Sequence, residues 1–447
     1  MFNRLLIANR GEIAVRIIRA CREMGITSVA VYSTADRDSL HAQLADESIC
    51  IGPAGAAESY LKPSSIIAAA EVADVEAIHP GYGFLAESPK FAGICRDCRI
   101  GFIGPTVDTI ALCGEKAACR RKVQEAGVPI APGSDSLSDP QQAADIAREI
   151  GYPILVKAAA GGGGCGMRIA HNEATLKHAV SMAASEAEAA FGNSGIYLEK
   201  FIENARHIEF QILGDNEGNR VCLGDRECTI QRRHQKLIEE TPSTALTPAL
   251  RTQMTKAALK AAEAVNYTNA GTVEFVLAPG GTFYFIELNA RIQVEHPLTE
   301  EATGIDLVRE QIRLAAGEPL GYDTVESRDA VIEARVYAED PSSNFRPNSG
   351  LIRRCHIPGG PGIRVDTHLF SGYEVPHYYD SLLAKVIARG KTRDEAIERI
   401  SGALGELFVE NIKTTAGLCA RIIHGDRFRR GDIGPDLLDE YLVKEKK

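Results

Sequence analysis

The stretch Ile286-Glu287-Leu288-Asn289-Ala290-Arg291-Ile292-Gln293-Val294-Glu295-His296-Pro297 alternates apolar and polar side chains up to Glu295. With a period of two, one face is apolar and the other carries two carboxylates, two amides and a guanidinium. A solvated edge strand is the simpler interpretation of alternation alone. However, the polar positions include no Lys, Ser or Thr, which favours an extended segment with a functional face.

A predicted hairpin brings another carboxylate to this face. The preceding strand joins it through a turn at 278–281. A four-residue loop sets Glu274 opposite Phe285, which puts Glu274 and Glu287 on one face, diagonal at about 7–8 Å between Cα atoms. Asn289 adds an amide oxygen, and such oxygens suit a hard cation. A shift of one residue would place the two glutamates on opposite faces.

Composition indicates an ordinary globular protein. The 447 residues suggest about three domains, and hydrophobic and charged residues make up 45% and 25% of the chain. A net charge of −10 argues against nucleic-acid or anionic-membrane binding. No apolar run approaches the roughly 18 residues of a membrane span. Eleven cysteines without an export signal predict reduced thiols and a cytoplasmic location.

The order of patterns predicts three units. Residues 1–114 alternate strands and helices, as in an α/β domain with a parallel sheet, but GxGxxG is absent after the first strand, so NAD binding is not supported. Residues 115–326 form a second unit, of which about 131–203 is a small α+β lid. Residues 327–447 form a third α+β unit.

A glycine-rich loop marks the lid. Lys157 ends an apolar strand, and five of the six residues at 161–166 are glycine. Glycines let backbone N–H groups approach an anion closely, and a lysine at the base of the loop adds charge. No Gly-Lys-Ser/Thr follows, so this is not a Walker loop. A flexible hairpin tip is the alternative to a phosphate-binding flap.

Two further stretches stand out. The loop at 79–87 places Tyr82 between two glycines directly after a strand, where such sheets bind ligands; a tight loop with an anchoring tyrosine explains the spacing equally. The basic run at 226–236 is dense for an acidic chain, and it predicts a loop aimed into a charged cleft rather than a solvated face.

Together, residues 287–297, 79–85 and 232–236 resemble biotin carboxylase, a member of the ATP-grasp superfamily. The resemblance runs from residues 7–13 to residues 378–381. It implies an α/β and α+β fold with three domains: an N-terminal parallel-sheet domain, an ATP-grasp core with a glycine-rich lid, and a C-terminal α+β domain. Cys165 departs from the pattern, because the family commonly carries arginine there.

The resemblance also implies site residues, carried over position by position. Those for ATP are Lys116, Lys157, Gly163, Gly164, Glu199, Lys200, Phe201, Ile202, His207, Gln231, His234, Glu274 and Glu287. Those for Mg²⁺ or Mn²⁺ are Glu274, Glu287 and Asn289, and those for bicarbonate are Lys236, Arg291, Gln293 and Val294. The catalytic set is Glu295 as general base with Arg291, Arg335 and Lys236, and biotin would contact Tyr82 and Arg335.

The implied function is ATP-dependent carboxylation of biotin with bicarbonate via carboxyphosphate, the first half-reaction of acetyl-CoA carboxylase in fatty acid synthesis. None of the five methionines adjoins a lysine, whereas the family's biotinylated lysine is flanked by methionines. The expected partners are therefore a separate biotin carboxyl carrier protein and carboxyltransferase subunits, with a homodimer as in the family. Open alternatives are a subunit of another acyl-CoA or pyruvate carboxylase, an ATP-grasp ligase without biotin, and a non-catalytic ATP-binding scaffold subunit.

Overall fold

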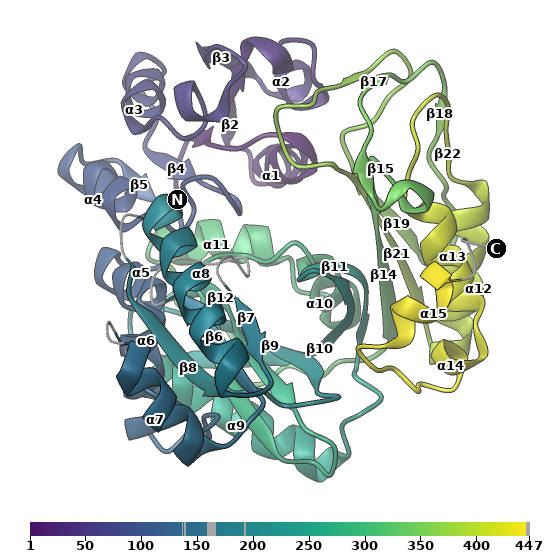
Figure 1. Ribbon diagram of the computed structural model, residues 1–447. Coiled ribbons are helices and arrows are strands. Elements are labelled where there is room, and N and C mark those ends of the chain that lie inside the picture. The colour runs from purple at the N-terminus through teal and green to yellow at the C-terminus, as the bar shows by residue number, and fades with distance from the viewer. Residues whose placement is uncertain (136, 138–139, 159–166, 192–193, 444–447) are drawn as a thin grey trace.

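The computed structural model describes residues 1–135, 137, 140–158, 167–191 and 194–443. Its N-terminal part, purple to blue in Figure 1, folds around a five-stranded sheet in the order β3-β2-β1-β4-β5, with all neighbours parallel. The predicted parallel α/β domain is thus confirmed. The elements are β1 (Arg4–Ile7), α1 (Gly11–Glu23), β2 (Thr27–Ser33), α2 (Leu40–Leu44), β3 (Glu47–Gly52), α3 (Pro63–Val72), β4 (Ala77–His79), α4 (Pro89–Asp97), β5 (Gly101–Phe102), α5 (Val107–Gly114) and α6 (Lys116–Glu125).

A second, smaller sheet forms the lid. It has three antiparallel strands in the order β7-β6-β8 and packs against two helices through a core of its own. The elements are α7 (Pro140–Ile150), β6 (Ile154–Ala158), β7 (Arg168–Ala170), α8 (Glu173–Phe191) and β8 (Ile196–Lys200). Gly163, Gly164 and Cys165 lie outside the described residues.

An eight-stranded antiparallel sheet connects the middle of the chain to its C-terminal part. Its strand order is β13-β12-β9-β10-β11-β14-β21-β19. Hydrogen bonds between β11 and β14 join the two regions, teal and green in Figure 1, into one surface. The strands are β9 (Arg206–Gly214), β10 (Arg220–Arg232), β11 (Gln235–Thr241), β12 (Asn269–Leu277), β13 (Phe283–Asn289), β14 (Ala330–Tyr337), β19 (Ile363–Thr367) and β21 (Leu382–Gly390).

Helices cover this sheet, and short strand pairs complete the C-terminal part, yellow at its end in Figure 1. No helix among the described residues is long and apolar enough to cross a membrane. The helices are α9 (Pro248–Ala264), α10 (His296–Thr303), α11 (Leu307–Ala315), α12 (Arg393–Glu406), α13 (Ala416–His424), α14 (Asp426–Arg429) and α15 (Leu437–Val443). The short strands are β15 (Glu339–Asp340), β16 (Arg346–Pro347), β17 (Gly350–Leu351), β18 (Cys355–His356), β20 (Glu374–Val375) and β22 (Phe408–Val409).

The predicted hairpin register is wrong, although its consequence for the site holds. Leu277 pairs with Phe283 rather than Thr282, a slip of one residue. A bulge between β12 and β13, next to Glu274, shifts the pairing by one more residue, and the total shift of two keeps both glutamates on the same face. Glu274 therefore lies directly opposite Glu287 instead of diagonal to it.

The prediction that one extended segment continues to Glu295 is also wrong. Strand β13 ends at Asn289, and 290–295 is irregular. The basic run at 226–236 differs from the predicted loop as well, because it forms the end of β10, a tight turn and the start of β11. In that turn Arg233 and His234 have φ of 47° and 67°, the left-handed region favoured by sharp reversals.

Candidate functional site

Two carboxylates and an amide meet on the β12–β13 hairpin. Glu274 and Glu287 are opposed across the strands, and Asn289 Nδ2 donates to Glu274 Oε1 at 2.7 Å. Glu274 and Asn289 are buried, and Glu287 is partly buried. Side-chain oxygens gathered from neighbouring strand positions match what Mg²⁺ and Mn²⁺ prefer. The hairpin therefore has the donor set predicted for a divalent cation.

Cationic side chains surround these carboxylates. Lys116 Nζ, at the start of α6, lies 2.5 Å from Glu287 Oε2, and His207 Nε2 lies 2.9 Å from Glu274 Oε2. Burial raises the pKa of Glu287, but the charge and hydrogen bond of Lys116, together with the charge of Lys157, bring that pKa below its usual value. Burial also raises the pKa of Glu274. The charges of Lys236 and His207 and the hydrogen bond from His207 together lower it below its usual value. Both groups are therefore carboxylates at neutral pH and fit a cation.

A second group of possible ligand atoms comprises His207, Glu209 and Glu274, all within 4.8 Å of one another. Lys236 Nζ already lies 2.7 Å from Glu209 Oε2 and 3.6 Å from Glu274 Oε1. An ammonium group in that position already supplies a positive charge to Glu209. The hairpin carboxylates have cationic neighbours too, so the preference for the hairpin rests on its three oxygen-bearing side chains at adjacent strand positions.

Donors for an anion lie beside the hairpin. Arg291 donates to Gln293 Oε1 at 2.7 Å and to Glu87 Oε2 at 3.0 Å, and Gln293 Nε2 donates to Glu274 Oε1 at 3.0 Å. Arg291 and Gln293 were predicted as bicarbonate ligands, and the structure places them together next to the carboxylates. Sequence reasoning gave Glu87 no role, although Glu87 ends the loop at 79–87.

Glu295 lies at the centre of a network of charged side chains. Lys236 Nζ is 2.5 Å from its Oε1, and an Arg335 terminal nitrogen is 2.7 Å from its Oε2. Burial raises the pKa of Glu295, but the charges of Lys236, Arg335 and Arg226 outweigh it and hold the pKa well below its usual range. Glu295 is therefore an ionised carboxylate, the form that a general base needs. The predicted catalytic residues Glu295, Lys236 and Arg335 are in direct contact.

A buried arginine that sequence reasoning did not assign supports this network. Arg226 is fully buried, and its Nε lies 2.5 Å from Glu209 Oε1. It also donates to Thr272 and Thr299 at 3.0 and 2.8 Å. Glu209 in turn holds Lys236, so Arg226 orients the site from behind. Its sequence signal was its place at the start of the basic run at 226–236.

The predicted nucleotide residues come from the lid and from the base of the large sheet. In the lid, Lys157 Nζ pairs with Glu199, which also lies 3.0 Å from Arg120 Nε. The Lys200 ammonium donates to the carbonyls of residues 151 and 152 at 3.0 and 2.7 Å, so it braces the lid. Lys200 is followed along the chain by Phe201 and Ile202.

His234 lies in the turn between β10 and β11. Burial lowers the pKa of His234, and the charges of His207, Lys157 and Lys116 lower it further. His234 is therefore near enough to both predicted phosphate lysines for their charges to act on it. Gln231 Nε2 lies 3.4 Å from His207 Nδ1 on the neighbouring strand.

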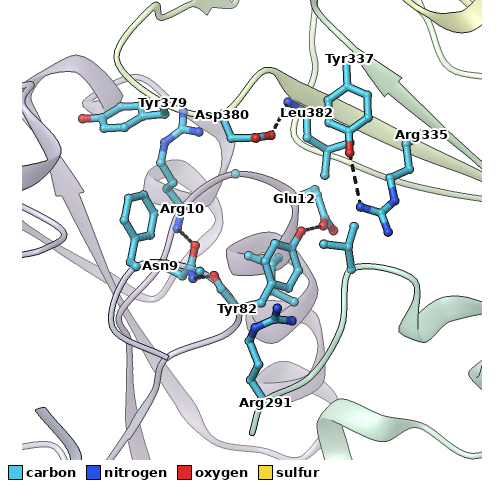
Figure 2. A pocket seen from close by; sticks show the side chains of 15 residues that line it. Asn9, Arg10, Glu12, Tyr82, Arg291, Arg335, Tyr337, Tyr379, Asp380 and Leu382 are labelled. Carbon is cyan, nitrogen blue, oxygen red and sulfur yellow. Dashed lines mark hydrogen bonds between the residues drawn. The ribbon is translucent and has the colours of Figure 1, made fainter. Parts of the chain in front are cut away.

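A cavity of about 350 Å³ opens beside this network, between the N-terminal and C-terminal parts. Figure 2 shows Tyr82, Arg291 and Arg335 around it. The Tyr82 hydroxyl donates to Glu12, a residue that sequence reasoning did not assign. Val294 and the aromatic residues Phe84, Tyr337 and Tyr379 also line the cavity. Its walls suit a small ring with a polar edge.

Comparison with known families covers nearly the whole chain. Residues 1–110 match the biotin carboxylase N-terminal domain, residues 115–322 the ATP-binding domain of the carbamoyl-phosphate synthase L chain, and residues 333–440 the biotin carboxylase C-terminal domain. Biotin carboxylase from Nostoc sp. is 52% identical over 442 residues, which is 98% of this chain and 99% of that protein. A pyruvate carboxylase component from Methanothermobacter thermautotrophicus is 50% identical over 99% of this chain and 90% of its own length.

Solved structures give the same result. A biotin carboxylase–β,γ-ATP complex from Campylobacter jejuni superposes with a TM-score of 0.96 at 44% identity, covering 98% of this chain and 99% of that one. The biotin carboxylase domain dimer of Hydrogenobacter thermophilus 2-oxoglutarate carboxylase, bound to MgADP, ADP and bicarbonate, has a TM-score of 0.95 at 47% identity, covering 99% and 98%. The predicted three-domain fold is confirmed, and the chain belongs to the biotin carboxylase family of ATP-grasp ligases.

Proposed function

We propose that this chain uses ATP and bicarbonate to carboxylate biotin carried on a separate protein. The observation that carries the proposal is the direct contact of Glu295 with both Lys236 and Arg335, next to the opposed carboxylates of Glu274 and Glu287. A scaffold subunit would not need an ionised, buried carboxylate between two cations beside a cation site. The membership in a family of ligases supports catalysis over a scaffold role.

Each predicted residue has a role in this proposal. Lys116, Lys157, His234 and the loop residues Gly163 and Gly164 hold the phosphates of ATP. Glu274, Glu287 and Asn289 would hold Mg²⁺ or Mn²⁺, which would supply positive charge against the phosphates during phosphoryl transfer. The nucleoside lies against the remaining predicted ATP residues, Glu199, Lys200, Phe201, Ile202, His207 and Gln231.

Bicarbonate binds where Arg291, Gln293, Lys236 and the Val294 backbone meet. Glu295 takes its proton, and the resulting oxygen nucleophile attacks the γ-phosphoryl group to give carboxyphosphate and ADP. Carboxyphosphate breaks down to CO₂ and phosphate, and the phosphate removes the proton of the biotin ureido nitrogen, which then attacks CO₂. Arg335 stabilises the negative charge that develops on the biotin oxygen, and Tyr82 positions the ring in the cavity.

The finer assignments extend the proposal. We assign the chain to acetyl-CoA carboxylase and fatty acid synthesis; relatives named as pyruvate carboxylase and 2-oxoglutarate carboxylase components make those acceptors the second candidate. A carrier protein, carboxyltransferase subunits and a homodimer are the proposed partners, and the cytoplasm is the proposed location. Boundaries near 114 and 326, with a lid at about 131–203, are proposed for the domains, supported by the gaps between the family matches.

An ADP-release assay with bicarbonate and free biotin tests the function. Turnover should require ATP, bicarbonate and a divalent cation, and biotin should stimulate it. Arg335→Ala should remove the biotin stimulation. Absence of stimulation with the unaltered chain, or full stimulation in Arg335→Ala, would contradict the proposal. Identification of co-purifying subunits would then decide between the acyl-CoA and keto-acid acceptors.

A further inference from the structure

Two buried glutamates stand behind Arg335 without a place in the mechanism above. Glu239 on β11 and Glu333 on β14 are directly opposed in the antiparallel ladder, and their exposed fractions are 1% and 0%. Directly opposed positions bring side chains to within about 4.5–5.5 Å between Cβ atoms. Two acids are therefore enclosed side by side on one face of the sheet.

The two acids differ in their contacts. Glu239 Oε1 forms an ion pair with Arg335 Nε at 2.5 Å, although the two atoms are not aligned as a hydrogen bond. Neither oxygen of Glu333 has a hydrogen-bond partner among the described residues. A buried carboxylate without a partner is costly, and a neutral carboxylic acid in that place costs much less. The geometry thus assigns the negative charge to Glu239, next to the guanidinium.

Arg335 is held by this acid and by the catalytic carboxylate. Its Nε faces Glu239, one terminal nitrogen faces Glu295 at 2.7 Å, and the other donates to the Tyr337 hydroxyl at 3.3 Å. The edge of the guanidinium that reaches the cavity is therefore aimed by Glu239 from one side. If Glu295 moves to bicarbonate during turnover, Glu239 is the carboxylate that keeps Arg335 in place.

We propose that Glu239 and Glu333 share a single negative charge and act as positioning residues for Arg335, with Glu239 ionised and Glu333 a neutral acid. This inference rests on the proposed function. It concerns chiefly the biotin-dependent step, because there Arg335 meets the substrate itself, whereas Lys236 and Arg226 also supply positive charge to Glu295 for the bicarbonate step.

The surroundings of the pair agree with one shared charge. Burial raises the pKa of Glu239 to about 7 against the opposing charge of Arg335, and burial together with Glu239 raises the pKa of Glu333 well above its usual range. The cations that act on the pair are Arg335, Lys236 and Lys385. The remaining titratable neighbours are Glu295, Tyr337 and the thiols of Cys228 and Cys419.

The test compares glutamine variants in two assays, ADP release with bicarbonate alone and ADP release stimulated by free biotin. Glu239→Gln should lower biotin-stimulated kcat/KM by roughly 10- to 100-fold, because a displaced guanidinium no longer meets the biotin oxygen. Its release of ADP with bicarbonate alone should change by no more than about twofold. Glu333→Gln copies the neutral acid and should stay within about threefold of the unaltered chain in both assays.

The pH profile gives a readout that a merely structural role would not move. Biotin-stimulated turnover should fall as the pH drops through the range where Glu239 gains its proton, near pH 7. Glu333→Gln should keep that profile. In Glu239→Gln the charge must come from Glu333, so the rise in activity should shift to higher pH. The double variant should show no increase of biotin-stimulated turnover with pH. Its turnover should also be lower than the combined effects of the two single variants predict.

Glu240→Gln is the matched control. Glu240 is buried on the same strand, one position along, and pairs with Arg393 instead. Its variant should leave the biotin stimulation and its pH profile unchanged. Equal damage from Glu239→Gln and Glu333→Gln, or none from Glu239→Gln, would overturn the proposal.

Two outcomes are kept separate. If Glu239→Gln does not fold, the Glu333→Gln profile decides, because an altered profile contradicts a neutral Glu333 and an unaltered one supports it. If the unaltered chain shows no biotin stimulation, the proposed function itself fails.

Discussion

Lys236 Nζ lies 2.5 Å from Oε1 of Glu295, and this contact joins the start of β11 to the turn before α10. Lys236 is also 2.7 Å from Glu209 Oε2, so one ammonium group is shared between two buried carboxylates. The arrangement keeps Glu295 ionised and fixes its direction before any substrate arrives. A base prepared in this way needs little rearrangement to accept a proton from bicarbonate.

Replacement of the base should abolish bicarbonate chemistry. Glu295→Gln keeps the size of the side chain but removes the proton acceptor, so bicarbonate-dependent ADP release should fall by about 10²- to 10⁴-fold. The control is Glu301→Gln, because Glu301 is a partly exposed carboxylate on the adjacent helix that pairs with Arg364 and Arg389 instead. Full activity of Glu295→Gln would show that another group takes the proton.

Loss of one of the side chains that bind the metal ion should weaken metal binding. Glu287→Gln should increase the Mg²⁺ or Mn²⁺ concentration for half-maximal ADP release by about tenfold or more. Removal of the cation with EDTA should stop turnover, and added Mg²⁺ should restore it. Glu263→Gln, at an exposed position on α9, should behave like the unaltered chain. An unchanged metal titration in Glu287→Gln would remove Glu287 from the ligand set.

The folded chain should lose stability as the pH falls below neutral. Burial lowers the pKa of His41 to about 4 and of His79, His296 and His368 to about 3. The unfolded chain protonates these groups near pH 6.5, so below about pH 6.5 it binds more protons than the folded chain. Each histidine then costs up to about 1.4 kcal/mol of unfolding free energy per pH unit.

Unfolding midpoints measured from about pH 8 to about pH 5 test this slope. His79→Asn should flatten it by one proton, and His424→Asn, at an exposed position, should leave it unchanged. A slope in His79→Asn equal to that of the unaltered chain would contradict the neutral buried state of His79.

A buried ion pair should be costly to break from one side. Lys385 is fully buried, lies 3.1 Å from Glu12 Oε1 and donates to the Val294 carbonyl at 2.9 Å. Lys385→Met leaves Glu12 without that partner and should lower the unfolding free energy by about 3–5 kcal/mol. Glu12→Gln added to Lys385→Met should recover much of this loss in urea unfolding. A double variant as unstable as the single one would show that the Val294 contact dominates.

The sequence predicted which residues form the site better than it predicted the course of the backbone through the site. Alternation placed Glu287 and Asn289 on one face because β13 is a regular strand there. The same alternation continues after Asn289, but the chain leaves the sheet, because Arg291 turns to Glu87 and Gln293 to Glu274. Periodicity reports local pattern, and these partners lie far away in sequence.

The hairpin register and the buried residues Arg226 and Lys385 could not be predicted from the sequence, for other reasons. Loop length and a bulge each shift the pairing by one residue, and no side-chain pattern announced the bulge beside Glu274. Lys385 interrupts an apolar strand, and only the arrival of Glu12 from α1 explains its burial. Arg226 stood in a basic run that predicted a loop facing a charged cleft, not a fully buried strand position. Long-range charge pairing, rather than local propensity, placed both.

The ladder between β11 and β14 determines which parts of the chain can be exchanged between relatives. Ending the chain near residue 326 would expose the β11 edge, a row of unpaired N–H and C=O groups that invites aggregation. The lid has a sheet and a core of its own, so it can be transplanted as a cassette. A chimaera that swaps residues 131–203 should remain soluble, whereas one joined within the eight-stranded sheet must carry matching partners for every strand it cuts.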